Sequence, residues 1–465
     1  MNQPLTNRSG GNPSGEPRES TPIDPARIAA ADVLAAVRER DAYANLILPK
    51  MLRDRKISGR DAALATELTY GTSRAAGTLD QIIAHVAKRP VADIDGPVLD
   101  VLRLGTYQLL RTRIGAHAAV STSVDLVRSR VGHGPVGFVN AILRKISQRD
   151  EELWVQELAP PITEDLIGHL AFQYAHPKWI AEVFNEALGG SAGALQAALA
   201  ADDERPLTHL VARPGLLTAE ELALITGGEV GLYSPYCVYL DGGDPGDLDP
   251  IREGIAGVQD EGSQLVARAL EQAPLIGDDN GRWLDLCAGP GGKAALLGAL
   301  AEIDGARVDA IEKAPHRAEL IRKATRDLPV DVQVADGRDP GLEPGYDRIL
   351  VDAPCSGLGA LRRRPEARWR RSPGDVTELV VLQQQLLESA VNLLRPGGVV
   401  VYATCSPHPA ETSQVVDRAV DELPVTAIDT RELVPIDGLG PGPYVQLWPH
   451  LYGTDAMFFA ALRKD

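Results

Sequence analysis

The chain has 465 residues, which is too long for one ordinary hydrophobic core, so two or three domains are expected. With 44% hydrophobic residues, no apolar run of membrane-spanning length and no apolar signal segment at the N-terminus, the composition predicts a cytoplasmic globular protein without membrane association. The formal net charge of −17 argues against a nucleic-acid partner on average, and the four cysteines lie too far apart for a zinc site or a disulfide framework, so we expect reduced thiols and no metal.

The N-terminal third of the chain changes character along its length. Residues 1–22 are rich in Gly, Pro, Ser and Asn and predict a disordered tail. Residues 23–150 repeat apolar residues at spacings of three and four, with short breaks, and predict an all-α bundle of six or seven helices. This block holds 19 Lys and Arg against 13 Asp and Glu. It is therefore basic although the whole chain is acidic, which permits a nucleic-acid partner.

Residues 151–255 have a mixed pattern. The stretch 162–188 predicts a helix that is interrupted at Pro177. RPLTHLVAR and CVYLDG predict strands on either side of a helix over 218–225. We therefore expect a small α+β connecting domain.

Residues 256–465 alternate strands and helices. The predicted strands are WLDLCA, RVDAIEK, VQVADGR, YDRILVDAP and GGVVVYATC. Strands separated by helices predict a parallel, Rossmann-like α/β sheet. The last segment, DAMFFAALRKD, predicts a strand that pairs antiparallel at an edge of this sheet.

A glycine-rich turn follows the first of these strands. Glycine lets the backbone approach a ligand closely and a helix N-terminus offers unpaired N–H groups, so this turn predicts a cofactor-binding loop. It lacks the GxGxxG and GxxxxGK[ST] spacings, which weakens the dinucleotide and P-loop interpretations, and a tight strand-to-helix corner is the alternative. The residues of the turn are Cys287, Ala288, Gly289, Pro290, Gly291, Gly292 and Lys293.

Further polar side chains follow the other strands, and ligands bind beyond the carboxyl ends of strands in such sheets. Glu312 lies where a carboxylate could bind ribose hydroxyls, and Asp336 could meet a nucleobase edge. Asp352 and Cys355 follow the fourth strand, and Cys405 follows the fifth. Taken alone, Cys405 would be a small apolar residue at a strand end. Two neighbouring strands that both present a cysteine favour a catalytic site instead.

Several motifs together resemble one protein family. VQDEGSQLVA, CAGPGGKA, DRILVDAPCSGLG, LRRRPEARWRR and LRPGGVVVYATCSPHPAE are similar to the successive motifs of the RsmB/Sun family of S-adenosylmethionine-dependent RNA cytosine-5 methyltransferases. RDAALATELTYGTSR, VLDVLRLGTYQLL and FVNAILRKIS resemble the NusB-like RNA-binding domain that RsmB members carry in front. The resemblance covers roughly residues 25–465. It implies a NusB-like helical domain (23–150), the connecting domain (151–255) and a Rossmann-like class I methyltransferase domain (256–465).

The resemblance also implies roles for individual residues. Cys405 would be the nucleophile and Cys355 would assist product release, with S-adenosyl-L-methionine as the cofactor and small-subunit (16S) rRNA as the substrate. The residues that it assigns to the cofactor and the reacting base are the 287–293 turn, Glu312, Asp336 and Asp352. The chain departs from the family pattern at Ala294, where a hydroxyl is lost, and in DAMFF, where the family usually has DGFF.

The chemistry of such a reaction independently requires these residue types. Carbon 5 of cytosine is a poor nucleophile, so a group must add to carbon 6, and a thiolate such as that of Cys405 does this best. A base must then remove the proton from carbon 5. Asp352 is the candidate acid near the base N3, either held protonated or sharing a proton with N3.

An arginine-rich segment lies directly after DAPCSG. We expect it to hold RNA phosphates and to stack on bases, with a solvated surface as the alternative. The predicted RNA-binding residues are Arg362, Arg363, Arg364, Arg368, Trp369 and Arg371.

Other functions are compatible with parts of the sequence. The same chemistry could act on tRNA, and a chain of this kind could be a non-catalytic RNA-binding ribosome assembly factor. A nicotinamide-dependent oxidoreductase is disfavoured because GxGxxG is absent. Nothing in the sequence requires more than a monomer.

Overall fold

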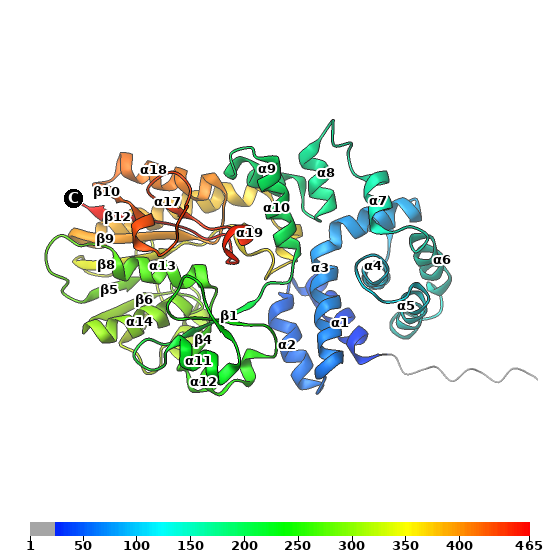
Figure 1. Cartoon of the computed structure of the whole chain (residues 1–465), viewed down its shortest axis with the longest axis horizontal. Coiled ribbons are helices and arrows are strands. Elements are labelled where there is room, and N and C mark those ends of the chain that lie inside the picture. The colour runs from blue at the N-terminus through cyan, green and yellow to red at the C-terminus, as the bar shows by residue number, and fades with distance from the viewer. Residues whose placement is uncertain (1–23) are drawn as a thin grey trace, which may run out of the picture.

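The computed structural model describes residues 24–465, so the predicted tail at 1–22 lies outside the described residues. Figure 1 shows a helical domain, a connecting region and a large α/β domain joined into one elongated molecule. No helix within residues 24–465 is long and apolar enough to cross a membrane. No group of three or more His, Cys, Asp or Glu side chains in that range is placed to hold a metal ion.

The N-terminal domain is an all-α bundle, as predicted. Asp24 caps the first helix by accepting a hydrogen bond from the Ala26 N–H, and Pro25 begins that helix at the position where proline is favoured. The helices bury Ala, Leu, Ile and Val side chains in a shared core. The helices are α1 (Pro25–Arg40), α2 (Ala44–Asp54), α3 (Gly59–Ala87), α4 (Gly96–Arg111), α5 (Ala116–Arg130) and α6 (Val136–Ile146).

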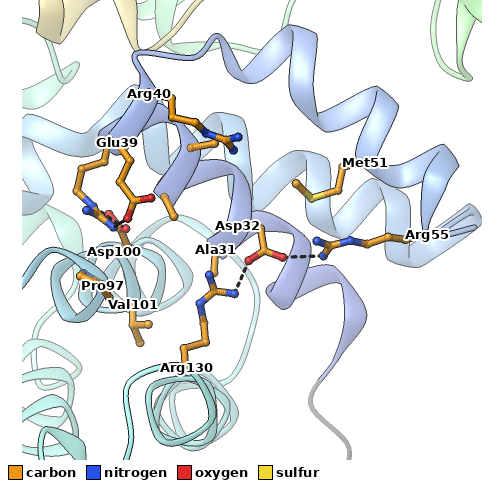
Figure 2. Close-up of a pocket in the computed structure, with 13 residues that line it drawn as sticks. Ala31, Asp32, Glu39, Arg40, Met51, Arg55, Pro97, Asp100, Val101 and Arg130 are labelled. Atoms are coloured by element: carbon orange, nitrogen blue, oxygen red, sulfur yellow. Dashed lines mark hydrogen bonds and ion pairs between the residues drawn. The ribbon is translucent and has the colours of Figure 1, made fainter.

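A hollow of about 510 Å³ opens between α1, α2, α4 and α5 (Figure 2). Its charged side chains pair with one another across these helices. Asp32 of α1 accepts hydrogen bonds from Arg130 at 2.5 Å and forms an ion pair with Arg55 at 2.7 Å. Arg38 reaches Asp100 of α4 at 3.0 Å. These ion pairs join the helices around the hollow.

The connecting region consists of helices followed by a small sheet. Four helices come first, and the chain breaks at Pro177 into two of them, as predicted. The sheet has the order β2-β3-β1-β4 and is antiparallel throughout. The elements are α7 (Glu151–Leu158), α8 (Leu166–Gln173), α9 (Lys178–Ala187), α10 (Ala192–Asp203), β1 (Thr208–Ala212), α11 (Ala219–Thr226), β2 (Glu229–Val230), β3 (Cys237–Leu240), α12 (Asp249–Glu253) and β4 (Ala256–Val258).

The C-terminal domain is built on an eight-stranded sheet. Its main path has the order β10-β12-β9-β8-β5-β6-β7, and β11 pairs with β12 outside this path. The five strands from β7 to β9 are parallel, as predicted for a Rossmann-like domain. The strands are β5 (Arg282–Asp285), β6 (Arg307–Ile311), β7 (Val330–Gln333), β8 (Tyr346–Asp352), β9 (Leu394–Thr404), β10 (Val425–Ile428), β11 (Val445–Gln446) and β12 (Phe458–Lys464).

The last strand is antiparallel, but its predicted place at an edge is wrong. β12 lies between β9 and β10, and the short strand β10 forms the edge. The burial of β12 explains this position, because Phe458, Phe459 and Leu462 are almost fully buried and need cover on both faces of the sheet.

Helices cover both faces of this sheet (Figure 1). One hydrophobic cluster packs α13 and α14 on one face, and another packs α17 and α18 on the opposite face. The carboxyl ends of β5, β6, β8 and β9 therefore meet at one edge, between the two layers of helices. The helices are α13 (Glu261–Gln272), α14 (Gly292–Asp304), α15 (Pro315–Ala324), α16 (Ala367–Arg370), α17 (Pro373–Leu393), α18 (Ser413–Glu422) and α19 (Pro449–Tyr452).

Candidate active site

Two cysteines meet at the carboxyl edge of the sheet. β8 and β9 are adjacent and parallel, with Asp352 opposite Ala403. The chain therefore presents Cys355 and Cys405 side by side just beyond the two strands, with 3.4 Å between their Sγ atoms. Both thiols are partly exposed, so a substrate can reach them. The structure brings together the two cysteines that the strand-end argument selected.

The two thiols are electrostatically different. A hydrogen bond from the Cys355 thiol, aided by the positive charges of Arg364 and Lys293, lowers the pKa of Cys405, although burial and Asp352 oppose this effect. The pKa of Cys355 is raised well above its ordinary value by the hydrogen bond to Cys405 and by burial. Cys405 is therefore the thiol that ionises first, and Cys355 stays protonated beside it.

Lys293 and Asp352 form an ion pair next to the cysteines. The Lys293 Nζ atom donates to a carboxylate oxygen of Asp352 at 2.8 Å, and both side chains are largely buried. Burial is the largest single influence and would lower the pKa of Lys293, but the charge and hydrogen bond of Asp352, together with the negative charges of Cys405 and Asp285, outweigh it and the net pKa is raised. Lys293 therefore stays positively charged and holds Asp352 in place.

A buried carboxylate joins the two cysteine loops. Glu411 has no exposed surface, and it accepts a hydrogen bond from the Ser356 N–H at 2.8 Å and from the Ser406 hydroxyl at 2.7 Å. The Ser356 hydroxyl and the Gln383 amide also donate to it. Glu411 thus fixes the residue after each of the two cysteines, and the sequence analysis did not single it out.

The glycine-rich turn connects β5 to α14 as predicted. A Cβ atom at Gly289 would lie 2.0 Å from a Glu312 carboxylate oxygen, so only glycine leaves room for that side chain. Gly291 has a φ of 112°, in the left-handed region that glycine tolerates. Glu312 itself is buried at the end of β6, where it accepts from the Ala314 N–H at 2.8 Å and pairs with Arg317 at 3.4 Å.

Asp336 lies after β7, farther along the same edge. It accepts hydrogen bonds from Arg338 at 2.7 Å and Lys313 at 3.0 Å, and these contacts hold its pKa well below the ordinary value. A surface hollow of about 510 Å³ opens beside it. The structure therefore brings the 287–293 turn, Glu312, Asp336 and Asp352 to one edge of the sheet, in the order of the strands.

Comparison with known proteins identifies the family of this chain. The family model for the 16S rRNA methyltransferase RsmB/F matches residues 273–463, and the NusB family model matches residues 24–148. The chain is 32% identical over 451 residues to the ribosomal RNA small subunit methyltransferase B of Pseudomonas putida, covering 94% of this chain and 98% of the relative. The chain belongs to the RsmB/F family of rRNA methyltransferases.

Two further similarities extend over the same length. A Mycobacterium tuberculosis protein named "Putative methyltransferase Rv1407" is 62% identical over 445 residues, covering 95% of this chain and 97% of the relative. The crystal structure of PH0851 superposes with a TM-score of 0.78 at 22% identity, covering 96% of this chain and 100% of the other. The second similarity confirms the fold of the RsmB/F chain, including its arrangement of domains.

The cofactor of the RsmB/F family is S-adenosyl-L-methionine, and the residues present here fit it. Asp285, at the end of β5, is fully buried, and neither of its carboxylate oxygens has a hydrogen-bond partner within residues 24–465. Burial and the negative charge of Asp352 raise its pKa to about 7. A buried carboxylate with free acceptor atoms is suited to a cationic group of a ligand. The sequence analysis missed Asp285 because its place in WLDL looked like part of a core strand.

The arginine-rich segment requires a correction. Arg362 is buried and donates to Asp455 at 3.1 Å, and Arg363 reaches both Asp455 at 2.9 Å and Asp260 at 2.8 Å. Arg368 has no exposed surface, and its guanidinium donates to backbone carbonyls of the connecting helices. Arg362 and Arg363 are thus held by carboxylates of their own domain, and Arg363 and Arg368 also donate to carbonyls of the connecting region, so the prediction that these three arginines bind RNA does not agree with the structure.

Trp369 requires the same correction. Its indole N–H donates to the carbonyls of Ser73 and Arg74 in α3, and its ring packs on Gly77 and the helical core. The guanidinium groups that the structure leaves at the surface are those of Arg364, which is exposed, and Arg371, which is half-buried. Within the segment, RNA binding stays a prediction for these two residues.

Proposed function

We propose that the protein transfers a methyl group to carbon 5 of a specific cytosine in small-subunit rRNA through a covalent cysteine–cytosine intermediate. The observation that carries this proposal is the pair of thiols at 3.4 Å with opposite pKa shifts. One thiolate and one neutral thiol are the two groups that addition to carbon 6 and later elimination require. The pair stands beside an ion pair and a cofactor loop, at the edge where ligands bind in such sheets.

The addition step uses Cys405 and Asp352. The Cys405 thiolate adds to carbon 6, and the ring electrons move toward carbon 5, which becomes nucleophilic. Addition also requires a proton at N3, and the Lys293 ammonium, which donates to the Asp352 carboxylate at 2.8 Å, supplies it: the proton passes through Asp352 to N3 as the thiolate adds. When bound, S-adenosyl-L-methionine supplies the electrophilic methyl group. Cys405, Asp352 and Lys293 form the catalytic core of the proposal.

The release step requires transfer of the proton on carbon 5 to a base, and we assign this role to a solvent water that enters beside the two cysteines. The electrons of that C–H bond re-form the double bond between carbons 5 and 6, and Cys405 leaves as a thiolate. Cys355, next to Cys405, is placed to assist by donating to the departing sulfur, which is the stronger leaving group when hydrogen-bonded. Loss of Cys355 should therefore affect release more than addition.

The substrate class rests on the relatives. Curated relatives of this length are named ribosomal RNA small subunit methyltransferase B, and a family model for NusB matches the helical domain. A cytosine must be unstacked before a thiolate can reach carbon 6, so the target would be a single-stranded or extruded nucleotide. A cytoplasmic monomer that acts on unassembled rRNA is the form that we propose.

The test compares the parent protein with Cys405→Ala and Cys355→Ala on an unmodified small-subunit rRNA transcript, using S-adenosylmethionine labelled in its methyl group. We expect the label to enter one cytosine with the parent and to be lost with Cys405→Ala. A protein–RNA adduct that resists denaturing gels should accumulate with Cys355→Ala. Cys237, which is buried in the small sheet, supplies the matched control, and Cys237→Ala should still transfer the label.

Two outcomes would contradict the proposal. Label on tRNA but not on rRNA would keep the chemistry and change the substrate. RNA binding without any transfer would favour a non-catalytic assembly factor, and Cys405 would then be a small residue at a strand end.

A further inference from the structure

A turn of the helical domain reaches the loop that follows Cys355. The Arg370 guanidinium donates to the carbonyls of Val37 at 2.9 Å, Asp41 at 3.0 Å and Ala42 at 2.8 Å, at the end of α1. The Ala44 N–H, at the start of α2, donates to the buried Glu366 carboxylate at 3.2 Å. The α1–α2 turn is therefore fixed against the methyltransferase domain.

This turn carries an aromatic side chain that the fold leaves open. Tyr43 is 39% exposed, and it is the only Phe, Tyr or Trp of residues 24–465 that belongs to the exposed large hydrophobic side chains. The guanidinium of Arg364 lies 5.8 Å from its ring centroid, and that of Arg370 lies 5.6 Å away. Cation–π contacts at these distances hold a ring in one orientation. Tyr43 is thus an exposed but oriented aromatic surface.

The turn is also connected to the catalytic cysteine. The Gly359 N–H donates to the Cys405 carbonyl at 2.9 Å, and the Arg364 N–H donates to the Ala360 carbonyl at 3.1 Å. Arg364 is therefore separated by about one turn of the chain from Gly359, the residue that contacts Cys405. The effect of its charge on the Cys405 thiol agrees with this proximity. Tyr43 of the helical domain therefore lies beside Arg364, and Arg364 in turn lies near the reactive sulfur of Cys405.

We propose that Tyr43 is a stacking platform for an RNA base next to the target cytosine, and that Arg364 binds the adjoining phosphate. The inference deepens the proposed function, since it names a contact of the RNA with the helical domain at the same site. Proteins that hold single-stranded RNA combine exposed aromatic rings with arginines along the backbone path. Trp369 is packed against α3 and the helical core, so it cannot stack on an RNA base. Tyr43 is the exposed ring that can.

The test measures RNA affinity and turnover separately. Parent, Tyr43→Ala, Tyr43→Phe, Arg364→Ala and Leu46→Ala would be titrated with single-stranded oligocytidylate and with the unmodified rRNA transcript. One stacked base contributes about 1–3 kcal/mol, so Tyr43→Ala should weaken RNA binding by about tenfold or more. Tyr43→Phe should rescue it because the ring remains, while S-adenosylmethionine affinity and the melting temperature of Tyr43→Ala stay at the parent values.

Leu46→Ala is the matched control, because Leu46 is an exposed apolar side chain of α2, three residues beyond Tyr43, and has no aromatic ring. RNA binding by Leu46→Ala as weak as that by Tyr43→Ala, or parent affinity in Tyr43→Ala, would overturn the inference. The two proposals fail separately. A parent that binds oligocytidylate through Tyr43 but transfers no methyl group would overturn the proposed function alone, and a parent that methylates with no effect of Tyr43→Ala would overturn this inference alone.

Discussion

Two buried aspartates on neighbouring strands differ in their hydrogen-bond partners. Asp347 of β8 has no exposed surface and accepts hydrogen bonds from Arg395 and from the N–H groups of Asn280 and Arg282. Asp285 of β5 is equally buried, but no side chain in residues 24–465 donates to its carboxylate, and the nearby Cys287 N–H only partly offsets the rise of its pKa. An unsatisfied buried carboxylate lowers stability. The folded protein keeps Asp285 in this state at the carboxyl edge of the sheet, beside the glycine-rich turn.

Replacing Asp285 should therefore stabilise the cofactor-free protein above about pH 7. Its pKa is raised from 3.8 to about 7 in the folded state, so the unfolded chain loses its proton first as the pH rises. The free energy of unfolding then falls between these two pH values by up to about 1.4 kcal/mol per pH unit. Asp285→Asn should remove this fall and weaken S-adenosylmethionine binding by tenfold or more. Urea unfolding at several pH values and calorimetric titration would measure both effects.

Asp347→Asn is the matched control. It should lower stability at pH 8, because the burial cost of Asp347 is offset by its donors, which hold its pKa below the ordinary value. If Asp285→Asn also lowered the free energy of unfolding at pH 8, the Asp285 carboxylate would not destabilise the folded protein. The argument that its free acceptor atoms serve the cofactor would then fail.

At the scale of elements, the active site is a junction of two loops that follow adjacent strands. Parallel pairing of β8 with β9 places Cys355 and Cys405 together, but a backbone register alone does not fix two sulfur atoms. Glu411, at the end of the second loop, receives donors from Ser356 and Ser406 and so holds both loops at the residue after each cysteine. It is a positioning residue for the pair.

Glu411→Gln should lower kcat by about tenfold or more. The NH₂ group of the new amide would face N–H and O–H groups that now donate to the carboxylate, and at least one of these hydrogen bonds would be lost. Loosening of the Cys355 loop would also weaken the hydrogen bond that lowers the pKa of Cys405. The midpoint of Cys405 alkylation against pH should therefore move upward, toward that of an ordinary thiol, while S-adenosylmethionine affinity is unchanged. Glu422→Gln, an exposed residue of α18, should leave kcat and the midpoint alone. An unshifted midpoint in Glu411→Gln would contradict the positioning role.

The sequence predicts those parts of this junction that depend on period and position. Strand ends follow from apolar runs bounded by turns, so Cys355, Cys405 and the 287–293 turn could be located without coordinates. The side on which a charged residue is buried does not follow from such patterns. Asp285 stands among apolar residues of a core strand, so its role was not predicted. The edge strand β10 is only four residues long, so it was not predicted either.

At the scale of the molecule, buried arginines join the three regions. Arg368 of α16 donates to the carbonyls of Ala175 at 2.9 Å and Asp202 at 3.1 Å, beside the core where α3 packs on Trp369. Asp455, in the DAMFF departure from the family pattern, accepts hydrogen bonds from Arg362 and Arg363 within the C-terminal domain, and Arg363 also donates to the Leu207 carbonyl of the connecting region at 3.0 Å. A run of arginines in sequence suggests a solvated or RNA-binding surface. These side chains are buried instead, because backbone carbonyls of distant segments accept their hydrogen bonds. Sequence patterns do not reveal such acceptors.

Arg368→Ala should lower the free energy of unfolding by about 3 kcal/mol, because two buried carbonyls lose their donor and a cavity replaces the side chain. It should leave the salt dependence of RNA binding unchanged, since no phosphate contact is lost. Arg364→Ala, on the exposed part of the same segment, should do the reverse, with a smaller salt slope and little loss of stability. Urea unfolding and RNA titrations at several salt concentrations would measure both variants. A smaller slope in Arg368→Ala without loss of stability would restore the original RNA-binding prediction for the buried residue.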